Sequence, residues 1–122
     1  MINAVAVVLP KMLARSSGHI AIMGSLFGYT GWPENGSYGA SKAAVINLAE
    51  SLKLELEGTG VAVTIINPGF VDTPLIPLNK RLDRSRMIQP RDIAEAVLYV
   101  LNTPVTACPV EMTIRPQQTP YR

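Results

Sequence analysis

Three short apolar runs alternate along this chain with three stretches of helical periodicity, and this alternation constrains the fold more than any other feature. The apolar runs are residues 19–24, 61–66 and 110–114. Apolar side chains recur every three or four positions in residues 2–14, in residues 37–57 and in the stretch that begins at Pro90. Helices that alternate with buried strands favour a parallel sheet with crossover helices. The sequence therefore predicts one α/β domain over residues 1–122, with a partial sheet of about three strands and flanking helices.

In such sheets, ligands bind beyond the carboxyl ends of the strands. Two segments are predicted to lie there: residues 25–36 after the first strand and residues 67–73 after the second. Both are rich in glycine, proline and hydroxyl-bearing residues. Residues 74–89 contain two prolines and several polar residues, and we expect them to form a mobile loop or lid.

Charge and hydropathy argue against two classes of partner. The formal net charge is only +2, so we expect no nucleic acid partner. The one basic cluster is Lys80, Arg81, Arg84 and Arg86, which we expect to be a solvated loop. No apolar run approaches the roughly 18 residues that span a bilayer, so we expect no membrane association.

The chain has one cysteine and one histidine, so we expect neither an internal disulfide nor a metal site. Cys108 lies in an apolar stretch and is expected to be a small core residue. His19 begins a strand-like run and is expected to be structural. A reducing compartment, the cytoplasm, is the default location.

Tyr38 and Lys42 lie four residues apart near the start of the clearest helical stretch, so they share one face of it. A phenol ionises near pH 10, but a nearby ammonium group stabilises the phenolate. The pair could therefore act as a general acid and base. Ser25, thirteen residues before Tyr38, could hold a substrate oxygen beside the phenol. A solvent-facing pair without catalytic function would show the same spacing, so the pair alone leaves both interpretations open.

Three motifs in order make a family resemblance specific. Residues 18–28, GHIAIMGSLFG, resemble the strand and serine turn of the short-chain dehydrogenase/reductase family. Residues 37–44, SYGASKAA, are similar to the Y-x-x-x-K helix start of that family, and the serine-to-tyrosine spacing also matches. Residues 67–74, NPGFVDTP, look like the segment that closes over the nicotinamide. The resemblance covers essentially the whole chain, and residues 111–117 are similar to the branch of NADP-dependent 3-hydroxy acid dehydrogenases.

The resemblance implies a role for each candidate residue. Ser25 would orient and polarise a substrate carbonyl, and Tyr38 would exchange a proton with the substrate oxygen. Lys42 would stabilise the tyrosinate and bind the nicotinamide ribose. The reaction implied is reversible hydride transfer between a small secondary alcohol or carbonyl substrate and NADP or NAD. The residues implied in cofactor binding are Tyr38, Lys42, Pro68, Gly69, Val71 and Thr73.

Parts of the family pattern do not occur in this sequence. It contains no G-x-x-x-G-x-G turn for the pyrophosphate, and the role of the family's catalytic asparagine is not carried over to Asn3. The resemblance thus implies a partial Rossmann-like sheet, the C-terminal half of the fold without its N-terminal βαβ half. Strand 19–24 should then pair with strand 61–66 on one side only, which leaves an apolar unpaired edge.

This unpaired edge predicts a partner, either a second copy in a homo-oligomer or a complementary N-terminal half. The missing turn also leaves a second interpretation of function open. The chain would then be a truncated, non-catalytic scaffold or interaction protein that does not bind cofactor alone.

Overall fold

The computed structural model describes residues 1–122 and contains all six predicted elements. The helices are α1 (Ile2–Ala14), α2 (Gly36–Glu55) and α3 (Pro90–Leu101), and the strands are β1 (Gly18–Met23), β2 (Val61–Pro68) and β3 (Glu111–Ile114). Two single turns of 3₁₀ helix, η1 (Leu26–Gly28) and η2 (Arg84–Arg86), lie in the loops. The predicted alternation of helix and strand is confirmed.

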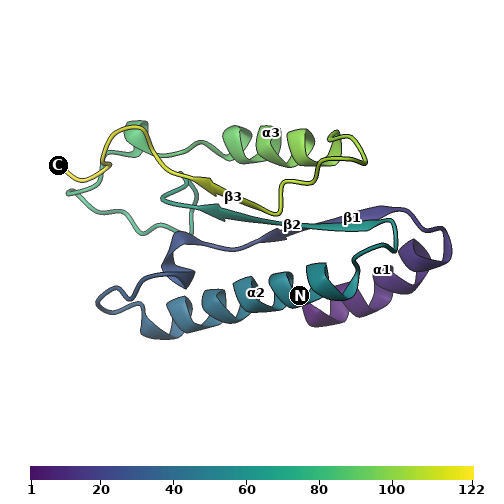
Figure 1. The fold of residues 1–122 in the computed structure, drawn as a ribbon. Coiled ribbons are helices and arrows are strands. Elements are labelled where there is room, and N and C mark those ends of the chain that lie inside the picture. Colours follow the sequence, from purple (N-terminus) through teal and green to yellow (C-terminus); the bar gives the residue numbers. More distant parts are fainter.

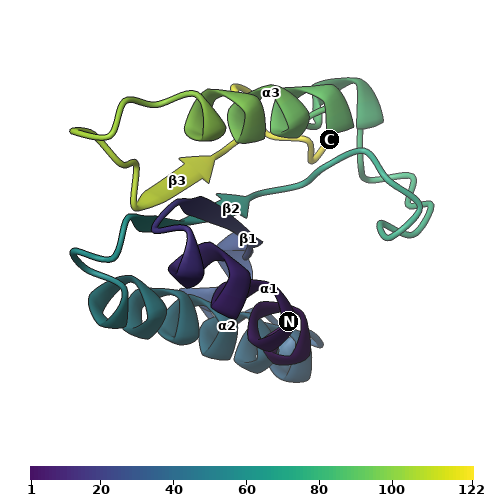
Figure 2. The same cartoon turned by 90° about the vertical axis from the view of Figure 1, so that its right-hand side faces the viewer.

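The three strands form one parallel sheet in the order β1-β2-β3. Helices α1 and α2 cover one face of this sheet and α3 covers the other, as Figures 1 and 2 show from two directions. This arrangement is the predicted partial Rossmann-like α/β fold. β1 pairs only with β2, so its other edge is unpaired as expected.

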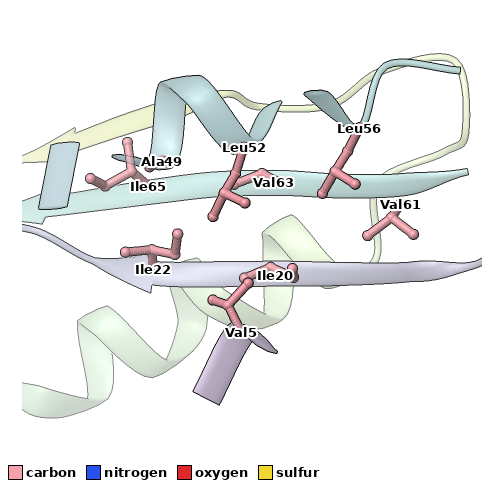
Figure 3. Packing of buried hydrophobic residues seen from close by; sticks show 9 residues of the cluster. All are labelled: Val5, Ile20, Ile22, Ala49, Leu52, Leu56, Val61, Val63 and Ile65. Carbon is pink, nitrogen blue, oxygen red and sulfur yellow. The ribbon is translucent and has the colours of Figure 1, made fainter. Parts of the chain in front are cut away.

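The core lies between the sheet and the α1–α2 layer. Nine buried apolar residues form it: Val5, Ile20, Ile22, Ala49, Leu52, Leu56, Val61, Val63 and Ile65 (Figure 3). Alternate residues of β2 point to this face because side chains alternate along a strand. They meet the stripe that α2 presents at positions three and four apart. The core therefore packs the second half of α2 against the sheet.

The opposite face of the sheet packs against α3. Ile66 of β2 and Val100 of α3 are fully buried there. Pro90 is the first residue of α3, as predicted, and the backbone N–H of Gln89 donates to the Asp92 carboxylate at 2.8 Å. A carboxylate in the first turn satisfies a free N–H and interacts well with the helix dipole.

Two predictions were wrong in detail. β2 was expected to end at residue 66, but it runs to Pro68 because Asn67 and Pro68 still pair with β3. Cys108 was expected in the core but is exposed, because it lies in the loop from α3 to β3 and not in an element.

No helix of the chain is long and apolar enough to cross a membrane. No cluster of three or more His, Cys, Asp or Glu side chains is arranged to hold a metal ion.

Candidate active site

The candidate residues follow the carboxyl ends of β1 and β2. Met23 pairs with Ile66 in the parallel register, so the carboxyl ends of both strands lie at the same end of the sheet. Ser25 follows β1, and the segment from Gly69 to Thr73 follows β2. The start of α2 lies at this end of the sheet too, on the left of Figure 1. The tertiary fold therefore gathers the three motifs at one end of the sheet.

Ser25 is buried, with 7% of its surface exposed. Its hydroxyl oxygen accepts a hydrogen bond from the backbone N–H of Phe27 at 3.2 Å and caps η1. A capped hydroxyl has one orientation favoured over the others. The serine side chain is thus held in place by its own turn.

Lys42 connects the tyrosine to the serine strand. Its Nζ lies 5.7 Å from the centre of the Tyr38 ring and donates a hydrogen bond to the Met23 carbonyl at 3.2 Å. Met23 is the last residue of β1, two positions before Ser25. The hydrogen bond to Met23 therefore holds the ammonium group near both the Tyr38 ring and the serine turn.

Close packing holds the serine turn against the start of α2. The Phe27 ring meets the Tyr38 ring edge-on, with centroids 6.2 Å apart. A Cβ added to Gly39 would lie 2.9 Å from the Phe27 carbonyl oxygen, and one added to Gly28 would lie 3.0 Å from the Lys42 carbonyl carbon. Both glycines are needed for this approach of loop to helix.

The third motif begins in β2 and continues beyond it. Pro68 is buried, and the Gly69 N–H donates to the Ile114 carbonyl at 2.8 Å. A Cβ on Gly69 would lie 3.2 Å from the Leu26 side chain, so this segment touches the serine turn. Val71 forms a β-bridge with Ile88. Thr73, half-buried, ends the segment.

Sequence reasoning missed the side chain of Asn67, which is fully buried beside the site. Its Nδ2 donates to the Tyr29 hydroxyl at 2.9 Å, and a Cβ on Gly24 would lie only 1.9 Å from its Oδ1. Burial, together with the hydrogen-bonding carboxylate of Glu111, raises the pKa of Tyr29 to about 12. The missed signal was the alternation of β2, which points residue 67 to the same face as Val63 and Ile65.

The basic cluster is only partly the solvated loop that was expected. Arg84 departs from it: the guanidinium forms an ion pair with Asp72 at 2.5 Å, and the side chain is only 32% exposed. A spacing of 12 residues between the partners has no periodicity that a sequence pattern could reveal.

The comparisons with known proteins point to one family. The family model described as "short chain dehydrogenase" matches residues 1–82. Uncharacterized oxidoreductases of Staphylococcus aureus are 44% identical over 108 residues, which is 88% of this chain and 46% of theirs. One from Staphylococcus saprophyticus is 44% identical over 115 residues, 94% of this chain and 47% of its own.

Solved structures of longer relatives share the fold. Serine dehydrogenase from Escherichia coli superposes with a TM-score of 0.79 at 31% identity, over 92% of this chain and 46% of that one. A closed form of serine dehydrogenase complexed with NADP+ gives 0.80 at 28% identity, over 92% of this chain and 49% of that one. The chain spans about half the length of the relatives that it matches.

Proposed function

We propose that this chain, which belongs to the short-chain dehydrogenase family, carries the catalytic residues of an NAD(P)-dependent oxidoreductase. The single observation that carries the proposal is the position of Lys42, whose ammonium lies between the Tyr38 ring and the last carbonyl of the serine strand. The same proposal takes residues 1–122 as one domain, the C-terminal half of the family's fold, located in the cytoplasm.

Each side chain has a task in alcohol oxidation. The Ser25 hydroxyl donates a hydrogen bond to the substrate oxygen and so orients the substrate. Tyr38, as phenolate, takes the hydroxyl proton while a hydride leaves the carbon of the same C–O bond, which becomes a carbonyl. Lys42 stabilises the phenolate that starts the step. Carbonyl reduction runs through the same groups in reverse.

NAD(P) supplies the hydride acceptor when it is bound. The residues present fit its nicotinamide end. The backbone of Pro68, Gly69 and Val71 with the Thr73 hydroxyl would hold it, because these residues follow β2 at the end of the sheet where Ser25 follows β1. No residues of this chain form a Gly-rich turn for the pyrophosphate end.

A 3-hydroxy acid is the substrate class that the comparisons support best. Serine carries its hydroxyl on carbon 3, and two of the similar structures are of serine dehydrogenase, one of them with NADP+. The tail of the chain supports the same branch. NADP is accordingly the first cofactor to test.

A partner is part of the proposal. The unpaired edge of β1 and apolar residues on α1, among them Ile2 and Val7 with 67% and 69% of their surfaces exposed, need cover. A second copy of the chain or a complementary N-terminal half would supply it, and the latter would also bring a pyrophosphate site.

The proposal is tested by titrating the purified chain, alone and with a complementary half, with NADPH while recording the fluorescence of its single tryptophan, Trp32. We expect saturable binding, and oxidation of 3-hydroxy acids by the preparation that binds. Tyr38→Phe should lower turnover by about 10²- to 10⁴-fold, the contribution typical of a general acid or base. Tyr99→Phe on α3, 60% exposed, is the matched control and should have no effect.

Full activity of Tyr38→Phe would exclude the proposed mechanism. Absence of binding at millimolar NADPH in both preparations would favour the non-catalytic scaffold.

A further inference from the structure

Arg84 binds three acceptors within one five-residue segment. Its Nε contacts the Asp72 carboxylate at 2.5 Å, its Nη2 donates to the Thr73 carbonyl at 2.8 Å, and its Nη1 donates to the Ile76 carbonyl at 3.1 Å. The planar fork of a guanidinium suits such a set, whereas an ammonium cannot reach all three acceptors at once. The side chains of Arg84 and Asp72 are 32% and 29% exposed, so water screens the pair only in part.

These contacts join Arg84, in the loop before α3, to residues 72–76, the far end of the segment that follows β2. The near end is already tied by backbone, because the Ile88 N–H donates to the Phe70 carbonyl and the Asp72 N–H donates to the Ile88 carbonyl. The Thr73 carbonyl accepts from both Arg84 and the Ile76 N–H. Without the guanidinium, the Thr73 carbonyl would keep only its hydrogen bond from the Ile76 N–H.

We infer that Arg84 is a positioning residue, which orders the Asp72–Ile76 segment and so places the Thr73 hydroxyl for the nicotinamide end of the cofactor. The inference rests on the proposed function for the identity of the ligand, but the ordering itself does not. Fixing the Thr73 peptide limits where its side chain can point. When this segment is already ordered, cofactor binding costs less conformational entropy of the protein.

Hydrogen exchange of the Asp72 and Ile76 amides tests the ordering in the full chain. Hydrogen bonds to charged groups are the strong ones, so Arg84→Gln should raise exchange of the Ile76 amide at least tenfold and that of the Asp72 amide, which the Ile88 carbonyl holds independently, by less. Arg84→Lys, which keeps the charge, should restore protection in part. The control is Arg91→Gln, which breaks an ion pair with Glu95 on the surface of α3, where Arg91 is 86% exposed, and should change neither amide. Equal exchange in Arg84→Gln and Arg91→Gln overturns the inference.

NADPH kinetics test the link to the ligand, in the preparation that binds NADPH. Arg84→Gln should raise the KM for NADPH about tenfold and leave kcat at saturating NADPH within about twofold, because the lost interaction acts on binding. Faster exchange with an unchanged KM would make Arg84 merely structural and overturn the positioning role.

Should the wild-type chain bind no NADPH in any preparation, the exchange data still decide whether Arg84 orders Thr73, and the oxidoreductase proposal fails separately. Should Arg84→Gln not fold, Arg84→Lys compared with Arg91→Lys decides on the same two amides.

Discussion

Two polar residues of β2, Thr64 and Asn67, are fully buried, and only Oδ1 of Asn67 lacks a hydrogen-bond partner there. The Thr64 hydroxyl, fully buried, donates to the Pro109 carbonyl at 2.5 Å and lies 2.7 Å from Nε2 of His19. His19 thereby has the structural contact between β1 and β2 that its position in the sequence indicated. A buried hydroxyl or imidazole left without a partner would cost about 1–3 kcal/mol. These contacts specify how β1 and β2 align.

His19 gives a prediction at this scale, because burial lowers its pKa below the usual 6.5. The folded state disfavours the charged imidazole, so its contribution to stability is complete above pH 6.5 and declines as the pH falls through the folded pKa. NMR titration of the single histidine should give a lower pKa in the folded chain than in the chain unfolded in urea. An equal or higher folded value would contradict the prediction.

At the scale of elements, the turn between α2 and β2 depends on two glycines with positive φ. Gly58 and Gly60 have φ of +78° and +82°. A Cβ on Gly60 would lie 2.1 Å from the carbonyl oxygen of Ser16, in the turn between α1 and β1, whereas a Cβ on Gly58 would meet nothing within 4 Å. The Gly60 backbone thus packs directly on the neighbouring turn.

The two glycines form a matched pair for mutagenesis. Gly58→Ala should lower the free energy of unfolding by about 1 kcal/mol, the cost of left-handed backbone in a residue with a Cβ. Gly60→Ala should lower it by about 3 kcal/mol, because the clash with Ser16 adds to that cost. Urea denaturation at one fixed protein concentration measures both. Equal losses would mean that the two turns do not pack as described.

At the scale of the whole molecule, both edge strands of the sheet have an unpaired side, and apolar residues on its helices lack cover. β1 has a single strand neighbour, and Met23 at its end is 44% exposed. On α3, Leu98 and Tyr99 are 58% and 60% exposed. An unpaired apolar edge is a template for association with another chain.

We therefore expect the purified 13.2-kDa chain to associate on its own and to become homogeneous when a complementary half is present. Ala21→Lys, at an exposed position of β1, should reduce self-association because a lysine protects a strand edge. Size-exclusion chromatography with light scattering measures both effects. A monodisperse wild-type monomer that melts cooperatively would refute the need for a partner.

The sequence by itself determined the type and order of the elements. Periodicities of 3.6 and 2 are local properties, so the helices at residues 2–14 and 90–101 and the strand at 61–66 could be read from neighbouring residues alone. Alternation also indicated a parallel sheet, and the family resemblance predicted that strand 19–24 pairs with strand 61–66. The serine, tyrosine and lysine could be named because their motif is also local.

Only the tertiary structure decided which distant side chains meet. Asn67 and Tyr29 are 38 residues apart with the whole of α2 between them, and Arg84 and Asp72 are 12 apart in irregular chain. The extension of β2 to Pro68 and the exposure of Cys108 likewise depend on where β3 and its preceding loop dock. Such contacts arise from the packing of whole elements, and no spacing along the chain encodes them.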